Sequence, residues 1–289
     1  MGLVSIHCAV LLFGLAGLFG KTIELSSLEI TWGRTTLAAV ALGGAILFKR
    51  LSFKIKKSEI ISFVIMGLLL AVHWWTFFHA IQIATVAIGL LSFASFPIIV
   101  MFIEPFTDNV SFKYSNLGYA FVSLLGVGLV LPDLSFQTDH SVGGLYGILS
   151  GALYAVVTIM NRRYIKTYSA VAIGFWQYLF ASLILSLFVI PSGISLDLET
   201  GTELLVLGFV FTALAHGLFI HGLREVQAGI ASLIGTLEPV YGVVAAAALL
   251  NEVPTRNTIL GGIVVLGVIL AATTRASSPA EETIVPSDR

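Results

Sequence analysis

The sequence predicts an all-α integral membrane protein whose ten transmembrane helices form two inverted five-helix repeats. The first observation is composition: 57% of the 289 residues are hydrophobic and 11% are charged, whereas soluble domains average about 25% charged residues. The mean hydropathy is +0.99. The second observation is a series of apolar stretches long enough to cross a bilayer. The third is a pair of stretches that each run from His to Pro, 142 positions apart.

Ten apolar stretches have the length of a spanning helix, which needs ~20 residues because each residue rises ~1.5 Å and the hydrocarbon layer is ~30 Å thick. In chain order they are Leu3 to Gly20, Leu28 to Phe48, Ile60 to His79, Ala84 to Ile103, Tyr114 to Leu131, Val142 to Asn161, Ala170 to Ile190, Thr202 to Leu223, Ala228 to Leu250 and Thr258 to Thr274. Polar links such as KRLSFKIKKSE, PDLSFQTDHS and PSGISLDLETGTE separate them. The first stretch has no basic segment before it and no A-x-A site after it, so we expect a span and not a cleaved signal peptide.

Two pairs of similar segments indicate an internal repeat. HAIQIATVAIGLLSFASFP (79–97) matches HGLREVQAGIASLIGTLEP (221–239) at its first His, an Ile, a Leu and its final Pro, and WGRTTLA (32–38) aligns with FWQYLFA (175–181) at a displacement of 143. Each pair occupies equivalent spans, and an odd number of spans per half inverts the second half, as in many secondary transporters. We therefore expect five-helix repeats over residues 1–137 and 138–275 and a disordered cytoplasmic tail over 276–289.

The distribution of basic residues predicts the orientation, because cytoplasmic loops carry an excess of Lys and Arg. Twelve of the fifteen basic residues fall on the side of the N-terminus: Lys49, Arg50, Lys54, Lys56, Lys57, Lys113, Arg162, Arg163, Lys166, Arg224, Arg275 and Arg289. Lys21 and Arg256 fall on the opposite side, and Arg34 lies within a span. We expect both termini in the cytoplasm and the chain in the inner (plasma) membrane.

Several function classes are disfavoured. The net charge of −1 and the scattered basic residues give nucleic acid no continuous positive surface. The sequence contains no H-E-x-x-H helix, no Walker loop and no G-x-S-x-G elbow, and Cys8 is its only cysteine. We therefore expect no enzyme activity, no cofactor and no metal. ATP is not the expected energy source, so transport would be facilitated or coupled to an ion such as a proton.

Two motifs resemble those of the EamA family of the drug/metabolite transporter superfamily. They are WGRTTLA, with Arg34 in the second span, and LEPVYGVVAAAALLNEVPT (237–255), in which Glu252 follows Pro239 by thirteen residues. The resemblance covers Leu3 to about Thr274, with one departure: Val110 follows Pro97 by thirteen residues. It implies a secondary transporter of a small organic metabolite, an amino acid or related amphipathic compound, with export favoured. An uptake permease of the same fold, or a membrane-embedded enzyme or scaffold, are the alternatives.

Two charged residues are the strongest candidates for the substrate or proton pathway. Glu238 lies near the centre of the ninth span, where an uncompensated charge costs ~2.5–3.5 kcal/mol. It would couple protons, capture a substrate amine or, as the structural alternative, bind a neighbouring backbone in its protonated form. Arg34 would capture a carboxylate or snorkel to the outer interface. Gln177 takes the place of Arg34 in the second half.

Aromatic and histidine residues supply further candidates. Trp74 and Trp75 are typical of an interfacial belt, yet successive helical residues point ~100° apart, so only one of them would face a cavity. His216 lies inside the eighth span and is a better pathway candidate than the histidines at span ends. Three more aromatics would either line the pathway or face lipid: Tyr154, Trp176 and Tyr241.

Pro97 and Pro239 predict bends in the fourth and ninth spans. Each proline frees the carbonyl four residues earlier, and such a bend is tolerated where neighbouring helices or cavity water satisfy that group. The bends would be hinges for alternating access or static features of packing. The expected partners are a small-molecule substrate, the lipid bilayer and protons, and the oligomeric state, monomer or dimer, stays open.

Overall fold

Every regular element that the structure, a computed structural model, describes is a helix; the described residues are 1–107, 115–130, 138–194 and 196–276. The first half contains α1 (Gly2–Ala16), α2 (Phe19–Thr22), α3 (Ser27–Phe48), η1 (Lys57–Glu59), α4 (Ile60–Ile83), α5 (Val86–Phe93), α6 (Phe96–Ile103), η2 (Glu104–Phe106) and α7 (Ser115–Val130). The second half contains α8 (Asp139–Tyr164), α9 (Ala170–Val189), η3 (Ile190–Ser192), α10 (Leu198–Gly208), η4 (Phe209–Leu214), α11 (Ala215–Gly222), α12 (Ala228–Gly235), α13 (Glu238–Leu249) and α14 (Arg256–Ala276).

One to three helical elements lie at each of the ten predicted stretches. Among the described residues, eight helical segments are long and apolar enough to cross a bilayer. The two others are α7, with 16 residues, and α14, with 21 residues. Helices suit a bilayer because each satisfies its backbone hydrogen bonds internally. Val110, most of the link PDLSFQTDHS and all of the predicted tail except residue 276 lie outside the described residues.

The fourth and ninth spans are each interrupted just before their proline, as predicted. In the fourth span α5 ends at Phe93 and α6 begins at Phe96, with Pro97 as its second residue. In the ninth span α12 ends at Gly235 and α13 begins at Glu238, followed by Pro239. Proline is tolerated in the first turn of a helix because that N–H has no intrahelical partner. Each break thus starts a new helix in the interior of the protein.

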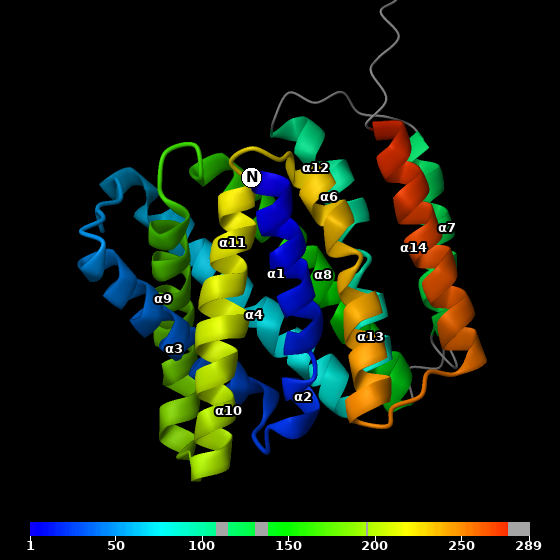
Figure 1. Ribbon diagram of the computed structural model, residues 1–289, viewed down its shortest axis with the longest axis horizontal. Helices are drawn as coiled ribbons and strands as arrows, with labels where there is room; N and C mark the ends of the chain where they lie inside the picture. Colours follow the sequence, from blue (N-terminus) through cyan, green and yellow to red (C-terminus); the bar gives the residue numbers. More distant parts are fainter. Residues whose placement is uncertain (108–114, 131–137, 195, 277–289) are drawn as a thin grey trace, which may run out of the picture.

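The two broken spans pack antiparallel to each other, α5 against α13 and α6 against α12. Around them α1 packs against α11 and α13, α4 against α8 and α9, and α3 against α9. Helices α7 and α14 lie side by side at one edge of the bundle (Figure 1). The approach of α1 to α13 requires Gly14, since a Cβ at that position would lie 2.8 Å from the carbonyl oxygen of Glu238. The crossing holds the start of α13 at the centre of the protein.

Candidate functional site

The central cavity lies beside the two helix breaks and is narrow in this structure, with a volume of about 20 Å³. Seven helices of the described chain contribute to its wall: α1, α3, α4, α5, α8, α11 and α13. The lining residues are Phe13, Ala16, Arg34, His73, Trp74, Phe77, Phe93, Tyr154, His216 and Glu238. An aromatic wall with a few polar groups is typical of a small-molecule site.

Arg34 comes from α3 in the first half and is anchored by the second half. Its side chain is 2% exposed. Nε donates to the hydroxyl of Thr212 at 2.9 Å, and Nη2 donates to the carbonyl of Phe211 at 3.3 Å. Both acceptors lie in the π-helical turn η4, a helical defect that is frequent at functional sites. The burial rules out the expected alternative, in which Arg34 snorkels to the interface.

The guanidinium of Arg34 also stands over two aromatic rings. Its Cζ lies 4.1 Å from the centroid of the Trp74 ring and 5.1 Å from that of Phe78. A desolvated cation–π contact contributes about 2 kcal/mol. Trp74 is 3% exposed, so it supports Arg34 and does not belong to an interfacial belt. A guanidinium has five N–H donors, and Arg34 uses two of them on described residues. The other N–H donors are available to an anion in the cavity.

Glu238 begins α13 and lines the cavity with a residue exposure of 5%. Its carboxylate makes no hydrogen bond and no ion pair with the residues that the structure describes. A buried carboxylate without a partner is costly, and such a group in a cavity wall is available to a cation or a proton. The cavity wall therefore carries a guanidinium group, from Arg34, and a carboxyl group, from Glu238, that do not form an ion pair with each other.

Two histidines, His73 and His216, add polar ring nitrogens to the aromatic wall. His73 Nδ1 lies 2.8 Å from the hydroxyl of Ser150, and that hydroxyl donates to the carbonyl of His73. Because the single hydroxyl proton is used in this way, Nδ1 carries the ring proton of neutral His73, and Nε2 is left as an acceptor. The ring of His73 stacks on Tyr154 with centroids 4.8 Å apart. His216 is T-shaped to Trp74, also at 4.8 Å.

The structure brings together some of the predicted residues and separates others. In the cavity wall lie Arg34, Trp74, Tyr154, His216 and Glu238. The remaining three lie elsewhere.

Each of these three has a different environment. Trp176 donates from Nε1 to the carbonyl of Phe53 at 2.9 Å, which fastens the link after α3. Gln177 donates to Asn161 at 2.5 Å and joins α9 to α8. Tyr241 is half-buried on the side of α13 that faces Gly14. Sequence reasoning missed His73, because the third span was expected to end at His79 whereas α4 continues to Ile83.

The described residues contain no group of three or more His, Cys, Asp or Glu side chains placed to hold a metal ion. His73, His216 and Glu238 share the cavity wall without forming such a group.

Comparisons with known proteins give a consistent result. The model of the EamA-like transporter family matches residues 1–131 and 141–274. Two proteins of Archaeoglobus fulgidus named as uncharacterized transporters are 23% and 26% identical over 55% and 52% of this chain, which covers only 58% and 54% of their lengths. A protein of Rickettsia bellii named as an S-adenosylmethionine uptake transporter is 21% identical over 84% of this chain and 82% of its own. A crystal structure with 17% identity superimposes with a TM-score of 0.71, covering 96% of this chain and 99% of that chain.

Proposed function

The chain belongs to the EamA-like transporter family, a family of multi-span membrane proteins, and we propose that it is a secondary transporter of a zwitterionic organic metabolite. It would alternate the access of the central cavity between the two sides of the inner (plasma) membrane, with export favoured. One observation carries the proposal: Arg34 and Glu238 line the same buried cavity without pairing. Such a site accepts a molecule that brings its own carboxylate and its own cation.

The substrate class follows from the chemistry of the wall. The N–H groups of Arg34 that make no internal hydrogen bond suit a carboxylate, since Arg pairs with that group in a planar, two-pronged geometry. Glu238 suits an ammonium or sulfonium group, and the rings of Phe13, Phe77 and Phe93 suit an apolar or aromatic side chain. An amino acid or a related amphipathic compound has these three parts. S-adenosylmethionine, which appears in the name of one relative, also has them.

We propose ten spans in two inverted halves, with α7 and α14 as the fifth and tenth. The helix contacts support this plan, because the packing of α4 on α8 has a counterpart in the packing of α1 on α11 when the halves are exchanged. The fourth and ninth spans pack on each other, as do the fifth and tenth. The two separate stretches matched by the family model support the division at residues 137 and 138. Such repeats commonly rock about a central site.

The excess of basic residues on the N-terminal side supports cytoplasmic termini. The same side then holds the end of α8 and the start of α12, and the outer side holds α2 and the end of α13 (Figure 1). Protons are the proposed coupling ion, because Glu238 is a buried titratable group without an internal partner. Pro97 and Pro239 are proposed hinges, since each sits at a helix break beside the cavity.

A flux screen in vesicles tests the proposal. Purified protein in liposomes is offered labelled zwitterionic solutes, together with anionic and cationic analogues that lack one of the two charges. We expect saturable flux of at least one zwitterion and weak flux of its single-charge analogues. Saturable flux of an analogue that lacks the carboxylate, at the rate of the parent solute, would contradict the role of Arg34. The uptake alternative is supported by the relative named as an uptake transporter, and solute loading on either side of the membrane separates the two directions.

A further inference from the structure

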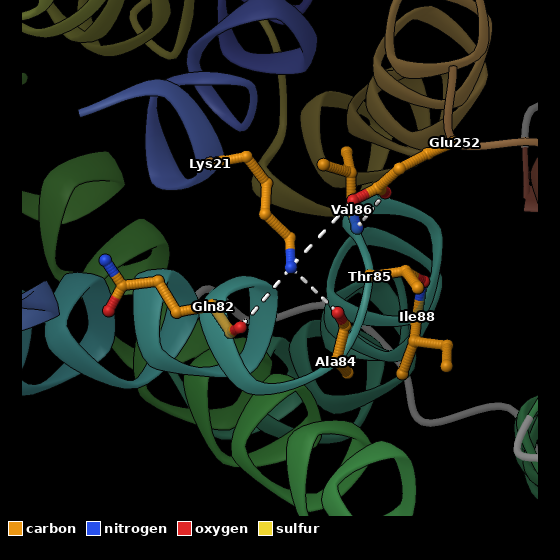
Figure 2. Close-up of polar contacts among 7 residues, drawn as sticks. All are labelled: Lys21, Gln82, Ala84, Thr85, Val86, Ile88 and Glu252. Carbon is orange, nitrogen blue, oxygen red and sulfur yellow. Dashed lines mark hydrogen bonds and ion pairs between the residues drawn. The ribbon is translucent and has the colours of Figure 1, made fainter. Parts of the chain in front are cut away.

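A cluster of charged and backbone groups lies on the side of α2 and joins the two halves of the chain, with Lys21 and Glu252 at its centre (Figure 2). Lys21, the penultimate residue of α2, donates from Nζ to the carbonyls of Ala84 at 2.9 Å and Gln82 at 3.3 Å. Glu252, which follows α13, accepts from the backbone N–H of Val86 at 2.9 Å. Lys21 Nζ and Glu252 Oε1 lie 3.8 Å apart. We call Lys21, Glu252 and these backbone partners the α2 clasp.

The α2 clasp is more than an ion pair, because each charge also binds the helix end of opposite sign. The last carbonyls of a helix carry a partial negative charge, and its first N–H groups carry a partial positive charge. Lys21 binds the end of α4 and Glu252 binds the start of α5. The hydroxyl of Thr85 caps α5 independently, by accepting from the N–H of Ile88. Glu252 is therefore not needed to start α5, and what it adds is a tie from the second half to the first.

The opposite end of the bundle has a matching arrangement. Arg162, near the end of α8, donates from Nη1 to the carbonyls of Leu223 and Arg224, directly after α11. Glu104, which follows α6, accepts from the backbone N–H of Gly229 at 3.1 and 3.2 Å, in the first turn of α12. We call Arg162, Glu104 and these partners the α8 clasp. In each clasp a cation binds the carbonyls at the end of one helix, and a carboxylate binds the N–H group at the start of the next helix. The α8 clasp therefore repeats the α2 clasp with the two halves of the chain exchanged.

The tight approach of Glu104 supports a specific fit at the α8 clasp. A Cβ at Gly229 would lie 2.7 Å from Oε2 of Glu104, a separation that side chains essentially never adopt. Glu104 is 6% exposed, so its carboxylate is held inside the protein at this contact. The glycine lets the carboxylate reach the backbone N–H.

The two clasps lie at opposite ends of the helix bundle. The α2 clasp is at the end of the bundle away from the N-terminus, and the α8 clasp joins the end of the fourth span to the start of α12, near the N-terminus (Figure 1). Both are closed in this structure, and the cavity residues are correspondingly buried: Arg34 is 2% exposed and Glu238 5%. Moving the two halves apart at either end requires the carboxylate there to leave the helix of the other half.

We propose, on the basis of the transport function above, that the clasps are the two gates of the cavity and that Lys21, Glu252, Arg162 and Glu104 are its gating residues. Opening the α2 clasp exposes the cavity to one side of the membrane, and opening the α8 clasp exposes it to the other. Glu252 leaves the N-terminus of α5 without breaking that helix, because α5 keeps the cap of Thr85. At the other gate α12 has no side-chain cap of its own, so the departure of Glu104 also frees the N–H of Gly229. Each gate is a contact between the two halves of the chain.

Cysteine accessibility tests the two gates without any transported solute. Ala16→Cys, in a Cys8→Ser background, places a thiol in the cavity wall. An impermeant thiol reagent is applied to intact cells and to inside-out vesicles. We expect Lys21→Gln and Glu252→Gln to raise the labelling rate about tenfold from one side only, since loss of a charge-assisted hydrogen bond shifts an equilibrium by about that factor. Glu104→Gln and Gly229→Ala should raise it from the opposite side only.

Matched variants separate gating from a loss of folding. Lys21→Arg keeps a cation on the carbonyls and should label like the parent protein. Glu29→Gln alters a carboxylate that caps its own helix through Ser26, so labelling from both sides should stay unchanged. The exchange Lys21→Glu with Glu252→Lys would restore a simple ion pair, but it places a carboxylate on carbonyls and an ammonium on an N–H. We therefore expect the cavity thiol of this double variant to be labelled faster than in the parent protein. Labelling as slow as in the parent would show that an ion pair alone holds the two halves together.

The outcomes that overturn the gates are distinct from those that overturn transport. Unchanged labelling in all four clasp variants, or increased labelling from the same side for both clasps, would reduce the clasps to anchors of loops. Absence of saturable flux together with side-specific opening would contradict the transport function and leave the clasps intact. Flux with unchanged labelling would contradict the gates alone.

Discussion

Replacement of Glu238 by Gln decides whether this carboxylate couples transport to protons, binds the substrate or has neither role. The side chain has no hydrogen-bond or ion-pair partner among the described residues. Gln has the same shape and stays neutral, so Glu238→Gln removes no hydrogen bond or ion pair; it removes the cost of a buried charge together with the attraction between that charge and Arg34. We expect its thermal stability in detergent to equal or exceed that of the parent protein. Any loss of transport then reflects the site and not the fold.

The two functional roles predict different magnitudes. If Glu238 carries one proton per cycle, each unit of pH gradient is worth about 1.36 kcal/mol, which is about tenfold accumulation of substrate. Glu238→Gln would lose that accumulation, whereas exchange of labelled for unlabelled substrate would persist because it moves no net proton. If Glu238 holds a substrate ammonium, removing one member of a buried charge pair costs about 2–5 kcal/mol. That range is a loss of affinity of about 30-fold to several thousandfold, and both transport modes would fail at low substrate concentration.

Proteoliposomes allow both modes to be measured on one preparation, with an imposed pH gradient for accumulation and preloaded substrate for exchange. Glu199→Gln serves as the control, because Glu199 is an exposed carboxylate on α10, away from the cavity. It should match the parent protein in both modes. Full retention of gradient-driven accumulation in Glu238→Gln would refute both functional roles and return this residue to a structural one.

Three further predictions address the fold and the second charge. Arg34→Lys keeps the cation but not the two-pronged geometry, so the affinity for a carboxylate substrate should fall at least tenfold and that for an analogue without the carboxylate should change little; equal losses for both would contradict carboxylate binding. Pro97→Ala and Pro239→Ala should lower the flux while the protein still inserts and folds, as judged by its size-exclusion profile, and unchanged flux in both would leave the breaks a packing role. Cysteines at Ser52 and Ser192, in a Cys8-free background, should differ in labelling by an impermeant reagent, and labelling of Ser52→Cys in intact cells would reverse the proposed orientation.

The sequence predicts the helices and the charged members of the site for the same physical reason. Apolar runs of ~20 residues have few alternatives to a spanning helix. A charge within such a run is expensive, which made Arg34 and Glu238 conspicuous. The sequence does not predict which way a helix is rotated. Gln177 aligns with Arg34 in the repeat, yet it points to Asn161 on α8 and not to the cavity. His73 was overlooked because α4 is longer than its apolar pattern indicated.

The clasps could not be predicted because their partners are backbone groups far away in sequence. Lys21 read as a basic residue of an outer loop, although its ammonium lies on carbonyls 61 and 63 residues later. Its ion-pair partner Glu252 belongs to the other half of the chain. When a carboxylate binds a backbone N–H, its partner is not a particular side chain, so no pair of residue types in the sequence indicates the contact. Only the packing of the fourth span on the ninth brings these groups together.

The departure at Val110 acquires a different meaning once both ends of the bundle are compared. In the second half the carboxylate that reaches across is Glu252, thirteen residues after Pro239. The corresponding position of the first half is Val110, outside the described residues, but Glu104, seven residues after Pro97, makes the matching contact with Gly229. The function of the contact depends on a carboxylate reaching a helix N-terminus and not on its place in an alignment. The two proposed inverted halves can therefore keep equivalent gates after their motifs have diverged, and the contacts show the equivalence where the aligned residues do not.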